Sequence, residues 1–398
     1  MKTDETKPAY QVPLMGEIAA VPKNGYRMVS TFSGAGGSCL GFEMAGFTPL
    51  WASEFVPAAA EVYRLNHPGV HLDERDIRKV SAQDILDAIG LGPGELDVFE
   101  GSPPCASFST AGKRSKGWGE VSTYSETEQR TDDLFFEYVR LIDEIQPKVF
   151  VAENVSGLIK GAAKGYFKNI LAAMKACGYQ VEARLLDSQW LGVPQARQRL
   201  IFMGVRNDLA RSPRYPTPLS YRYSVKDALP WIETAEHDTS GLWSTGDMLD
   251  RPSPTITVGV NSLASHHYQV TDKPGWGREE DIERGADISR YAIGSEWDKI
   301  GPGGQSEKYF QLVRPDAEAP SPTITASGGN SSIAGVTHPT ERRKFSIAEL
   351  KRICAFPDDF ELTGTYAQQW ERLGRSVPPV MMAAVARAVQ EVLDGDSE

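Results

Sequence analysis

Between Tyr26 and Val205, short apolar runs alternate with longer stretches of helical character. The apolar runs have the length and residue types of buried strands and lie at residues 26–32, 48–55, 96–102, 147–155, 179–186 and 199–205. The helical stretches lie near residues 56–65, 81–89, 132–145 and 164–177. Strands that alternate with helices predict an α/β fold, in which helices cover both faces of a doubly wound, mostly parallel sheet.

This alternation stops after Val205. Residues 206–340 are rich in Pro, Gly, Ser, Trp and Tyr, which predicts a second, smaller and irregular β-rich domain. The hexapeptide PSPTIT occurs there twice, at 252–257 and 320–325, and indicates either two similar strands or a small duplication. Beyond Pro379, apolar residues recur on one side of a predicted helix, which we expect to pack on the core.

Composition narrows the class of protein. A chain of 398 residues with 40% hydrophobic and 24% charged residues is an ordinary globular chain, long enough for two domains. It contains neither a long apolar run nor a secretory signal at its start, so we expect a cytoplasmic protein with no membrane partner. Four scattered cysteines and six histidines without ligand spacing predict no disulfide framework and no metal site. The net charge of −11 argues against general polyanion binding but is compatible with a local basic cleft.

The first predicted strand ends in a glycine-rich turn, FSGAGG at 32–37. Such a turn lets the backbone approach a nucleotide-like ligand closely. Cys39 stands where the dinucleotide pattern Gly-x-Gly-x-x-Gly has its last glycine, whereas Glu54 and Asp76 are acids suited to ribose hydroxyls. These features favour an adenosine-containing cofactor without a pyrophosphate; the alternative is an ordinary tight turn with solvated acids.

A cysteine follows two prolines after the strand at 96–102, in the segment GSPPCASFS. The carboxyl ends of parallel strands face the ligand cleft, so Cys105 is a candidate nucleophile once its pKa is lowered from about 8.5. The next segment carries Lys113, Arg114 and Lys116 beside Trp118, which suits a loop that closes on phosphates and bases. The alternative for this segment is a solvated basic loop.

Two further motifs place charged residues at strand ends. Glu153, in the triplet ENV, ends the strand at 147–155 and would lie beside Cys105 if the two strands were neighbours. The segment QARQR contains Gln195, Arg197 and Arg199, and alternation along a strand puts the two arginines on one face. Each motif by itself is also compatible with ordinary surface charges.

Taken in order, five segments resemble the DNA cytosine-5 methyltransferase family: FSGAGGSCLGFEMAGF, SPPCASFS, FVAENVSGL, LGVPQARQRLIF and LGRSVPP. The resemblance covers about residues 27–206 and 340–394. It implies a Rossmann-like methyltransferase sheet, S-adenosylmethionine as cofactor, double-stranded DNA as partner and a place in restriction–modification. We take the chain to act as a monomer.

The resemblance also implies a domain division and site residues. We expect an N-terminal extension (1–25), a catalytic and cofactor-binding domain (26–206), a target-recognition domain (207–340), a C-terminal motif segment (341–371) and a helix that returns to the catalytic domain (372–398). The cofactor-binding residues are predicted to be Phe32, Ser33, Gly34, Gly36, Gly37, Glu54, Phe55, Asp76, Ile77, Pro104, Leu134, Arg375 and Ser376. The predicted DNA contacts are Ser109, Lys113, Arg114 and Lys116.

The implied chemistry agrees with these residue types. Carbon 5 of cytosine is a poor nucleophile, and addition of the Cys105 thiolate to carbon 6 makes it enamine-like. Glu153, kept protonated by burial, donates to N3, while Arg197 and Arg199 hold the base edge and the surroundings of Glu153. Gln195 belongs to the same predicted catalytic set. The ring cannot be reached inside a duplex, so the base must flip out.

Two other functions stay open at this point. An RNA cytosine methyltransferase of the same family is one, although the long region after Arg206 favours a DNA reader. A non-catalytic DNA-binding homologue is the other, although the presence of Cys105, Glu153 and the QARQR residues argues against it. An NAD-binding enzyme is disfavoured by the glycine spacing.

One position departs from the family pattern. The usual Gly-Asn-Ser-Val-Pro-Pro reads here as Gly-Arg-Ser-Val-Pro-Pro, with Arg375 in place of Asn near the cofactor's reactive end. Either Arg375 turns to a phosphate or a nearby acid and the enzyme methylates, or it pairs with a carboxylate on the cofactor. The second alternative implies carboxy-S-adenosylmethionine as cofactor and 5-carboxymethylcytosine as product.

Overall fold

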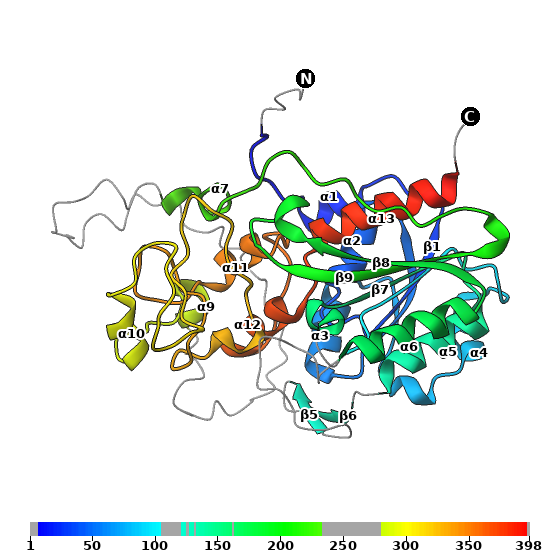
Figure 1. Cartoon of the computed structure of the whole chain (residues 1–398), viewed down its shortest axis with the longest axis horizontal. Coiled ribbons are helices and arrows are strands. Elements are labelled where there is room, and N and C mark those ends of the chain that lie inside the picture. The colour runs from blue at the N-terminus through cyan, green and yellow to red at the C-terminus, as the bar shows by residue number, and fades with distance from the viewer. Residues whose placement is uncertain are drawn as a thin grey trace.

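The computed structural model describes residues 7–104, 133–160, 163–232 and 280–395, together with the backbone of 121–124 and 127–130. Within these residues, seven strands form one sheet in the order β3-β2-β1-β4-β7-β9-β8 (Figure 1). Their bounds are Arg27–Thr31 (β1), Thr48–Ser53 (β2), His71–Asp73 (β3), Val98–Gly101 (β4), Val149–Val155 (β7), Tyr179–Asp187 (β8) and Gln198–Arg206 (β9). The backbone at Val121–Tyr124 (β5) and Thr127–Arg130 (β6) forms a separate antiparallel pair.

The sheet confirms the predicted α/β class. Strands β3, β2, β1, β4 and β7 pair in parallel, whereas β9 runs antiparallel to both β7 and β8. The reversal follows from the connection between β8 and β9, which is too short to hold a crossover helix. The prediction omitted β3, whose three residues are too few to give an apolar run.

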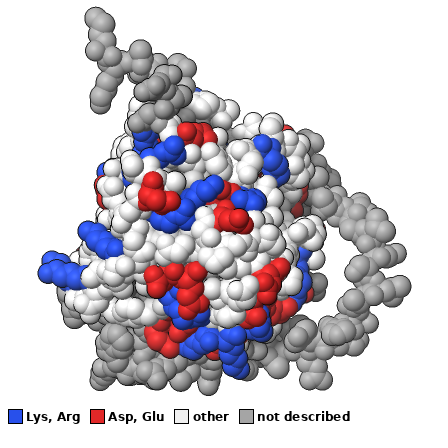
Figure 2. Space-filling view, turned by 90° about the vertical axis from the view of Figure 1, so that its right-hand side faces the viewer, with Lys and Arg blue, Asp and Glu red and all other residues white. Residues whose placement is uncertain are grey.

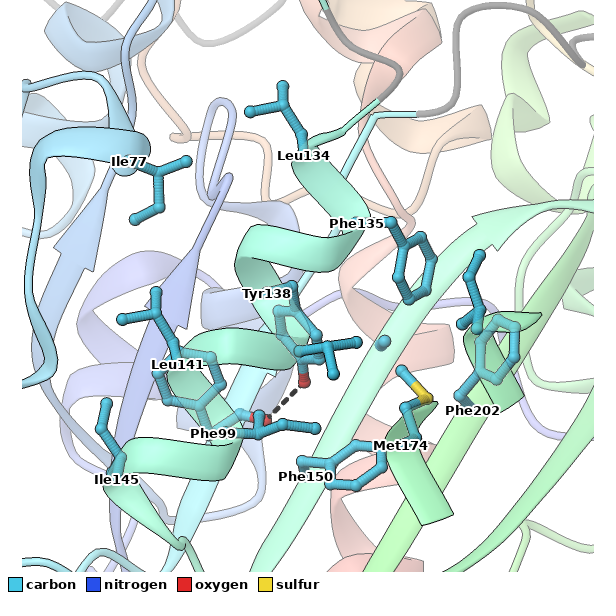
Figure 3. Packing of buried hydrophobic residues seen from close by; sticks show 14 of the residues in the cluster. Ile77, Phe99, Leu134, Phe135, Tyr138, Leu141, Ile145, Phe150, Met174 and Phe202 are labelled. Carbon is cyan, nitrogen blue, oxygen red and sulfur yellow. Dashed lines mark hydrogen bonds between the residues drawn. The ribbon is translucent and has the colours of Figure 1, made fainter. Parts of the chain in front are cut away.

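Helices cover both faces of the sheet, as Figure 1 shows. On one face lie α4 (Ala82–Ile89), α5 (Leu134–Ile145) and α6 (Ala163–Ala176); on the other lie α2 (Gly37–Met44), α3 (Pro57–Asn66) and α13 (Pro379–Asp394). Successive residues of one strand therefore enter different cores: Val98 packs with α13, and Phe99 packs with α5. On the α5 face, the buried Tyr138 hydroxyl lies 3.0 Å from Phe99 O (Figure 3) and 3.0 Å from Val151 O, so its one proton is shared between two backbone carbonyls.

The last helix, α13, packs on the core against α2, as its apolar stripe predicts. Helix α13 packs so closely on α2 that a Cβ on Gly41 would lie 2.5 Å from Pro379 O. The same contact brings the preceding segment against the glycine-rich turn, where a Cβ on Gly37 would lie 2.5 Å from Val377 O. Only glycine allows this approach, so α2 and α13 together set the position of both motifs.

The described parts of 207–340 are irregular, but they are not β-rich as the sequence predicted. They hold the short helices α7 (Val225–Ala228), α9 (Glu280–Arg284) and α10 (Ala292–Trp297). Helix α10 packs in a small apolar cluster, whereas α7 and α9 contribute Val225 and Ile282 to the larger cluster around Trp370. In ranges 207–232 and 280–340 the β structure consists of isolated bridges, because prolines and glycines interrupt longer pairing. The first PSPTIT copy lies outside the described residues. In the second copy, Ser321 bridges to Gln195.

Two more helices, α11 (Ile347–Ile353) and α12 (Tyr366–Arg375), connect this region to α13. Residues 7–25, expected to be a loose extension, contain α1 (Met15–Ala19) and bury Ile18 against the same apolar cluster as α11. None of the described helices is long and apolar enough to span a membrane. On the face drawn in Figure 2, acidic and basic side chains are interspersed, so the net charge of −11 is not concentrated there.

Candidate active site

A cavity of about 1080 Å³ opens at the carboxyl ends of the parallel strands. Its walls are the glycine-rich turn after β1, the ends of β2, β4 and β7, the start of β9, and segments 323–327 and 374–377. Open α/β sheets bind ligands at this edge, where strand order reverses. The volume lies at the upper end of the range of about 300–1,000 Å³ that is usual for ligand pockets.

The predicted cofactor residues converge on this cavity. Those that line it are Phe32, Ser33, Gly34, Gly37, Glu54, Phe55, Asp76, Ile77, Pro104, Leu134, Arg375 and Ser376. Gly36 lies behind the wall, where it has a φ of 89° and where a Cβ would lie 2.2 Å from the His67 ring. Phe32 has a φ of 53°, an uncommon backbone conformation for a non-glycine residue and one that is often found at functional sites.

Glu54 holds the glycine-rich turn from the side of β2. Its carboxylate accepts hydrogen bonds from Gly34 N at 2.8 Å and Val56 N at 2.7 Å. Burial raises the pKa of Glu54, and these backbone donors oppose that shift. The carboxylate is therefore oriented by the chain and still lines the cavity, where a ribose hydroxyl could reach it.

Asp76 is held in a similar way on the neighbouring wall. It accepts a hydrogen bond from Arg78 N and forms an ion pair with the Arg78 guanidinium at 3.2 Å. Arg78 also pairs with Asp133, at the start of α5, at 2.6 Å. Glu54, Asp76 and the apolar side chains of Ile77 and Leu134 fit an adenosine group. Its ribose hydroxyls would reach the two carboxylates, and its base would lie against the apolar wall.

The chain leading to Cys105 is tied to the end of β7. The Asn154 side chain donates to Pro103 O at 3.0 Å, and β4 pairs with β7 up to Gly101 and Ala152. The neighbouring strands that the sequence analysis required for Glu153 and Cys105 are therefore present. Cys105 itself lies outside the described residues, as do Ser109, Lys113, Arg114 and Lys116.

Glu153 ends β7 inside the cavity wall, buried and paired with an arginine. Arg199 Nε lies 2.5 Å from Glu153 Oε1, across the antiparallel pair β7–β9. Burial raises the pKa of Glu153, and the positive charges of Arg199 and Arg197 only partly oppose that shift. A carboxyl group in such surroundings can hold a proton closer to neutral pH than an exposed glutamate.

Arg197 and Gln195 have different surroundings from Arg199. The Arg197 guanidinium donates to Ile324 O at 3.1 Å and Arg375 O at 3.2 Å, so it joins the second PSPTIT segment to the end of α12. Gln195 is fully buried outside the cavity lining, and its Nε2 donates to Cys354 Sγ at 3.3 Å. Of the three, Arg199 forms the ion pair with Glu153, since the strand pairing sets it opposite Val155, two residues beyond Glu153.

Arg375 lines the cavity but already has a carboxylate partner. Its Nε and Nη2 atoms donate to Glu371 Oε1 at 3.0 and 2.9 Å, one turn earlier in α12. This is the nearby-acid arrangement among the sequence-based alternatives. It places a neutralised ion pair, rather than an isolated positive charge, beside this part of the cavity.

The sequence analysis missed one charged residue near this site, Glu100 in β4. It is 1% exposed and accepts hydrogen bonds from Ser30 and Ser38. A glutamate inside the apolar run LDVFEGS was the signal that could have revealed it. Among the described residues, no group of histidine, cysteine and acidic side chains has an arrangement that could hold a metal ion.

Comparisons with known proteins agree with this geometry. Residues 26–391 match the family described as C-5 cytosine-specific DNA methylase. The Type II methyltransferase M.NgoPII of Neisseria gonorrhoeae is 28% identical over 372 residues, which cover 93% of this chain and 97% of the relative. M1.HphI of Haemophilus parahaemolyticus, also a Type II methyltransferase, is 30% identical over 367 residues, which cover 91% of this chain and 86% of the relative.

Solved structures support the fold. A prophage-encoded protein of Escherichia coli described as a DNA modification methyltransferase superposes with a TM-score of 0.67 at 21% identity, covering 93% of this chain and 100% of the other. DNMT2 of Spodoptera frugiperda gives a TM-score of 0.58 at 17% identity, covering 92% and 100%. Both superpositions cover more than nine tenths of this chain and therefore include the sheet and the helices on its faces.

Proposed function

Because the chain belongs to the C-5 cytosine-specific DNA methylase family, we propose that it transfers a methyl group from S-adenosylmethionine to carbon 5 of a cytosine in double-stranded DNA. The observation that carries this proposal is the buried Glu153–Arg199 pair at 2.5 Å, in the wall of a cavity beside the strand that leads to Cys105. A proton donor next to a nucleophilic cysteine is what addition to a pyrimidine ring requires.

The reaction begins when a cytosine leaves the duplex and enters the cavity. The Cys105 thiolate adds to carbon 6, and Glu153 donates a proton to N3, so that electron density builds up at carbon 5. S-adenosylmethionine, when bound, supplies an electrophilic methyl carbon. After transfer, a base removes the carbon 5 proton, Cys105 leaves carbon 6 as a thiolate and N3 returns its proton to Glu153, so the ring regains its aromatic form.

Two arginines position Glu153 for proton donation. Arg199 orients the Glu153 carboxyl group, and Arg197 holds the segment behind it by backbone contacts. The raised pKa of Glu153 increases the fraction that carries the proton it must donate. The chain residues that would hold the cofactor are Glu54 and Asp76 for hydroxyls, with Ile77 and Leu134 for the base.

Covalent trapping tests this proposal. On duplex DNA with 5-fluorocytosine in place of cytosine, the covalent bond between Cys105 and carbon 6 persists, because the fluorine on carbon 5 cannot leave as a proton does. We expect a denaturation-resistant protein–DNA complex that needs S-adenosylmethionine and is lost in Cys105→Ser, whose hydroxyl is a far weaker nucleophile. Trapping on the matching RNA instead would indicate an RNA enzyme, and no adduct on either would indicate a non-catalytic homologue.

Methyl is the transferred group that the site favours. The alternative reaction uses carboxy-S-adenosylmethionine and gives 5-carboxymethylcytosine. It requires that Arg375 pair with the carboxylate of the cofactor. Glu371 already accepts two hydrogen bonds from Arg375, which accounts for the arginine without a carboxylate on the cofactor. The named relatives are likewise methyltransferases.

Mass spectrometry of nucleosides decides between the two groups. DNA is treated with wild type, Arg375→Asn and Glu371→Gln, with both cofactors offered together. We expect 5-methylcytosine from all three proteins. A carboxymethyl product from wild type that disappears in Arg375→Asn would establish the other cofactor.

A further inference from the structure

Two acidic residues at opposite ends of β4 differ in their partners. Asp97, just before the strand, is paired with Arg27 at 3.2 Å and Lys148 at 2.7 Å. Glu100, near the carboxyl end, accepts hydrogen bonds from the hydroxyls of Ser30 at 2.7 Å and Ser38 at 2.6 Å. The two buried carboxyl groups therefore differ in charge compensation: one meets two cations, and the other meets hydroxyl groups.

The surroundings of Glu100 hold acids rather than cations. The titratable groups that interact with it come from each element packed around it: Cys39 of α2, Tyr63 of α3, Tyr138 of α5 and Glu153 of β7. In the described part of the chain, no lysine or arginine contributes to its ionisation. Burial raises the pKa of Glu100 to about 7, although the two serine hydroxyls oppose this shift. A buried carboxylate without a cation is unfavourable, and such groups gather at functional sites.

Glu100 lies one hydroxyl group behind the cavity wall. Ser38, which donates to its carboxylate, lines the cavity at the start of α2. Ser30, its other donor, lies 2.9 Å from the hydroxyl of Ser33, which lines the cavity in the glycine-rich turn. The carboxyl group is thus directly beneath the turn on which a cofactor would rest.

We propose that Glu100 is a positioning residue whose buried negative charge makes the pocket prefer a cationic sulfonium cofactor over its uncharged thioether product. This inference rests on the proposed use of S-adenosylmethionine. The sulfonium would supply the positive charge that the described chain does not place near Glu100. Methyl transfer leaves S-adenosylhomocysteine, whose sulfur is neutral. The negative charge of Glu100 then has no positive partner on the ligand, so the product is bound less tightly.

Calorimetric binding of both ligands tests the proposal without turnover. The readout is the ratio of the two dissociation constants, Kd for S-adenosylhomocysteine over Kd for S-adenosylmethionine, in wild type and Glu100→Gln. Glutamine keeps the shape and hydrogen-bonding capacity but removes the charge. We expect the ratio to fall by roughly tenfold or more in the variant, because a unit charge at an effective dielectric of about 20 and a distance of about 10 Å changes a dissociation constant by about that factor.

Asp97→Asn is the matched control. It removes one negative charge from the other end of the same strand, where Arg27 and Lys148 compensate it. We expect its ratio to equal that of wild type. If Glu100→Gln instead weakened both ligands equally, Glu100 would be only a structural support and the proposal would be overturned.

A second measurement uses the wild-type protein and does not depend on how well the variant folds. Binding a cation near a carboxyl group that is half protonated near pH 7 favours its ionised form, so binding should release protons. Calorimetry in two buffers of different ionisation enthalpy should show more proton release for S-adenosylmethionine than for S-adenosylhomocysteine, once each free ligand's own titration is subtracted. Equal release would overturn the inference, whereas failure of wild type to bind either ligand would overturn the proposed function itself.

Discussion

Glu153 is subject to two opposing influences at the scale of a single residue. Burial destabilises its ionised form, whereas Arg199 at 2.5 Å stabilises it. The net effect is a raised pKa, with burial the larger contribution. A general acid needs this balance: it must hold a proton near neutral pH and still be oriented by a charged partner.

Replacing Glu153 with glutamine should lower the single-turnover rate by about 10²–10⁴-fold, because an amide cannot supply the proton to N3. Binding of S-adenosylmethionine should be unchanged. In wild type, the protonated fraction of Glu153 decreases as the pH rises through its raised pKa, so the rate should fall on the alkaline side. A variant with a near-normal rate, or one that keeps the alkaline fall, would remove Glu153 from the proposed role.

Asn154 acts at the same scale through a single hydrogen bond. Its side chain donates to Pro103 O at 3.0 Å, two residues before Cys105. Asn154→Ala should lower kcat by about tenfold to a hundredfold, because small displacements of a reacting group have effects of this size. Cofactor affinity should stay within about twofold of wild type, and an unchanged kcat would show that the nucleophile is positioned by other contacts.

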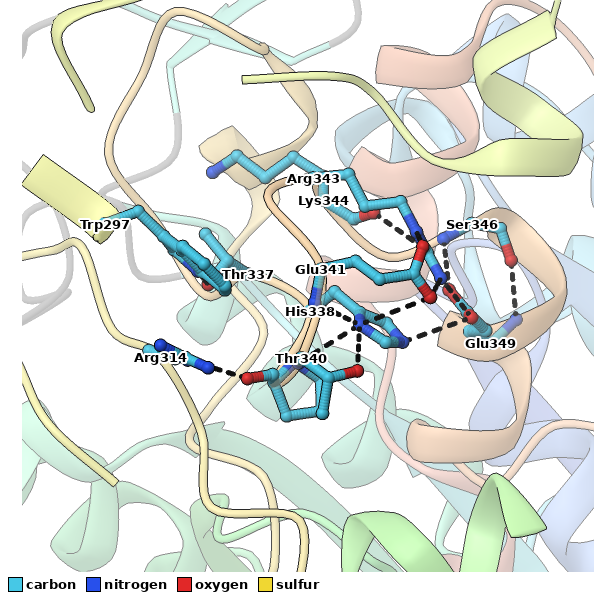
Figure 4. A network of polar contacts seen from close by, with 11 residues as sticks. Trp297, Arg314, Thr337, His338, Thr340, Glu341, Arg343, Lys344, Ser346 and Glu349 are labelled. Carbon is cyan, nitrogen blue, oxygen red and sulfur yellow. Dashed lines mark hydrogen bonds and ion pairs between the residues drawn. The ribbon is translucent and has the colours of Figure 1, made fainter. Parts of the chain in front are cut away.

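At the scale of elements, a buried polar network joins the segment 337–346 to α11 (Figure 4). Glu349 accepts two hydrogen bonds from Arg343, at 2.7 and 2.8 Å, and one from Ser346 N in the cap of α11. Burial by itself raises the pKa of Glu349, but the partners outweigh it and bring the pKa to about 2. Burial lowers the pKa of His338 to about 4, and its Nδ1 accepts from Glu341 N, so the ring is neutral.

Both groups make stability depend on pH. An unfolded His338 binds a proton below about pH 6.5, but the folded ring does so only near pH 4, so stability falls as the pH decreases between these values. Glu349 stabilises the fold above about pH 4.5, and this contribution is lost as the pH falls toward 2. Acid should therefore lower the free energy of unfolding over two overlapping pH ranges.

Glu349→Gln should lower the free energy of unfolding by about 3–5 kcal/mol, because it leaves the Arg343 guanidinium without its buried carboxylate. Glu341→Gln is the matched control, since Glu341 pairs with the same arginine but its side chain is 48% exposed. Its effect should be below about 1 kcal/mol. Urea denaturation followed by circular dichroism measures both, and equal losses would contradict the assigned importance of burial.

At the scale of the whole molecule, two distant segments of the predicted target-recognition domain (207–340) lie next to each other. Val225 N donates to Ala319 O at 3.0 Å, and Lys226 N donates to Ala317 O at 2.8 Å. The two ends of the segment between them therefore lie side by side. A segment joined in this way can be exchanged without moving the strands that carry Glu153 and Arg199.

Replacing residues 233–315 with the corresponding region of a relative should change the DNA sequence that is modified and leave the product unchanged. The reason is that the residues proposed for chemistry lie in the sheet body and its C-terminal segment. Sequencing of modified cytosines in treated DNA, with trapping on 5-fluorocytosine as the control for chemistry, measures the outcome. A chimera that traps DNA but keeps the original target would contradict the assignment of this region to recognition.

The sequence by itself determined the elements and the motifs at their ends. The spacing of apolar residues distinguishes strands from helices, because a strand buried on both faces of a sheet is a continuous apolar run. The strands β1, β4 and β7 lie where such runs predicted them. Glycines and prolines act on their own backbone, so the turn at 32–37 and the Pro-Pro step before Cys105 are local signals. Most residues that the family resemblance predicted to hold the cofactor line one cavity, because the carboxyl ends of parallel strands meet at one edge of the sheet.

Only the tertiary structure decided which partners each charged side chain meets. Arg375 could have faced a phosphate, an acid or a cofactor, and the direction of its side chain in α12 set it against Glu371. Arg197 reaches Ile324 O, 127 residues away in the chain. Glu100 became a buried carboxyl group because Ser30 and Ser38, distant from it in sequence, close over it in the folded sheet. Charge and burial depend on neighbours brought by folding, and a local pattern contains no record of them.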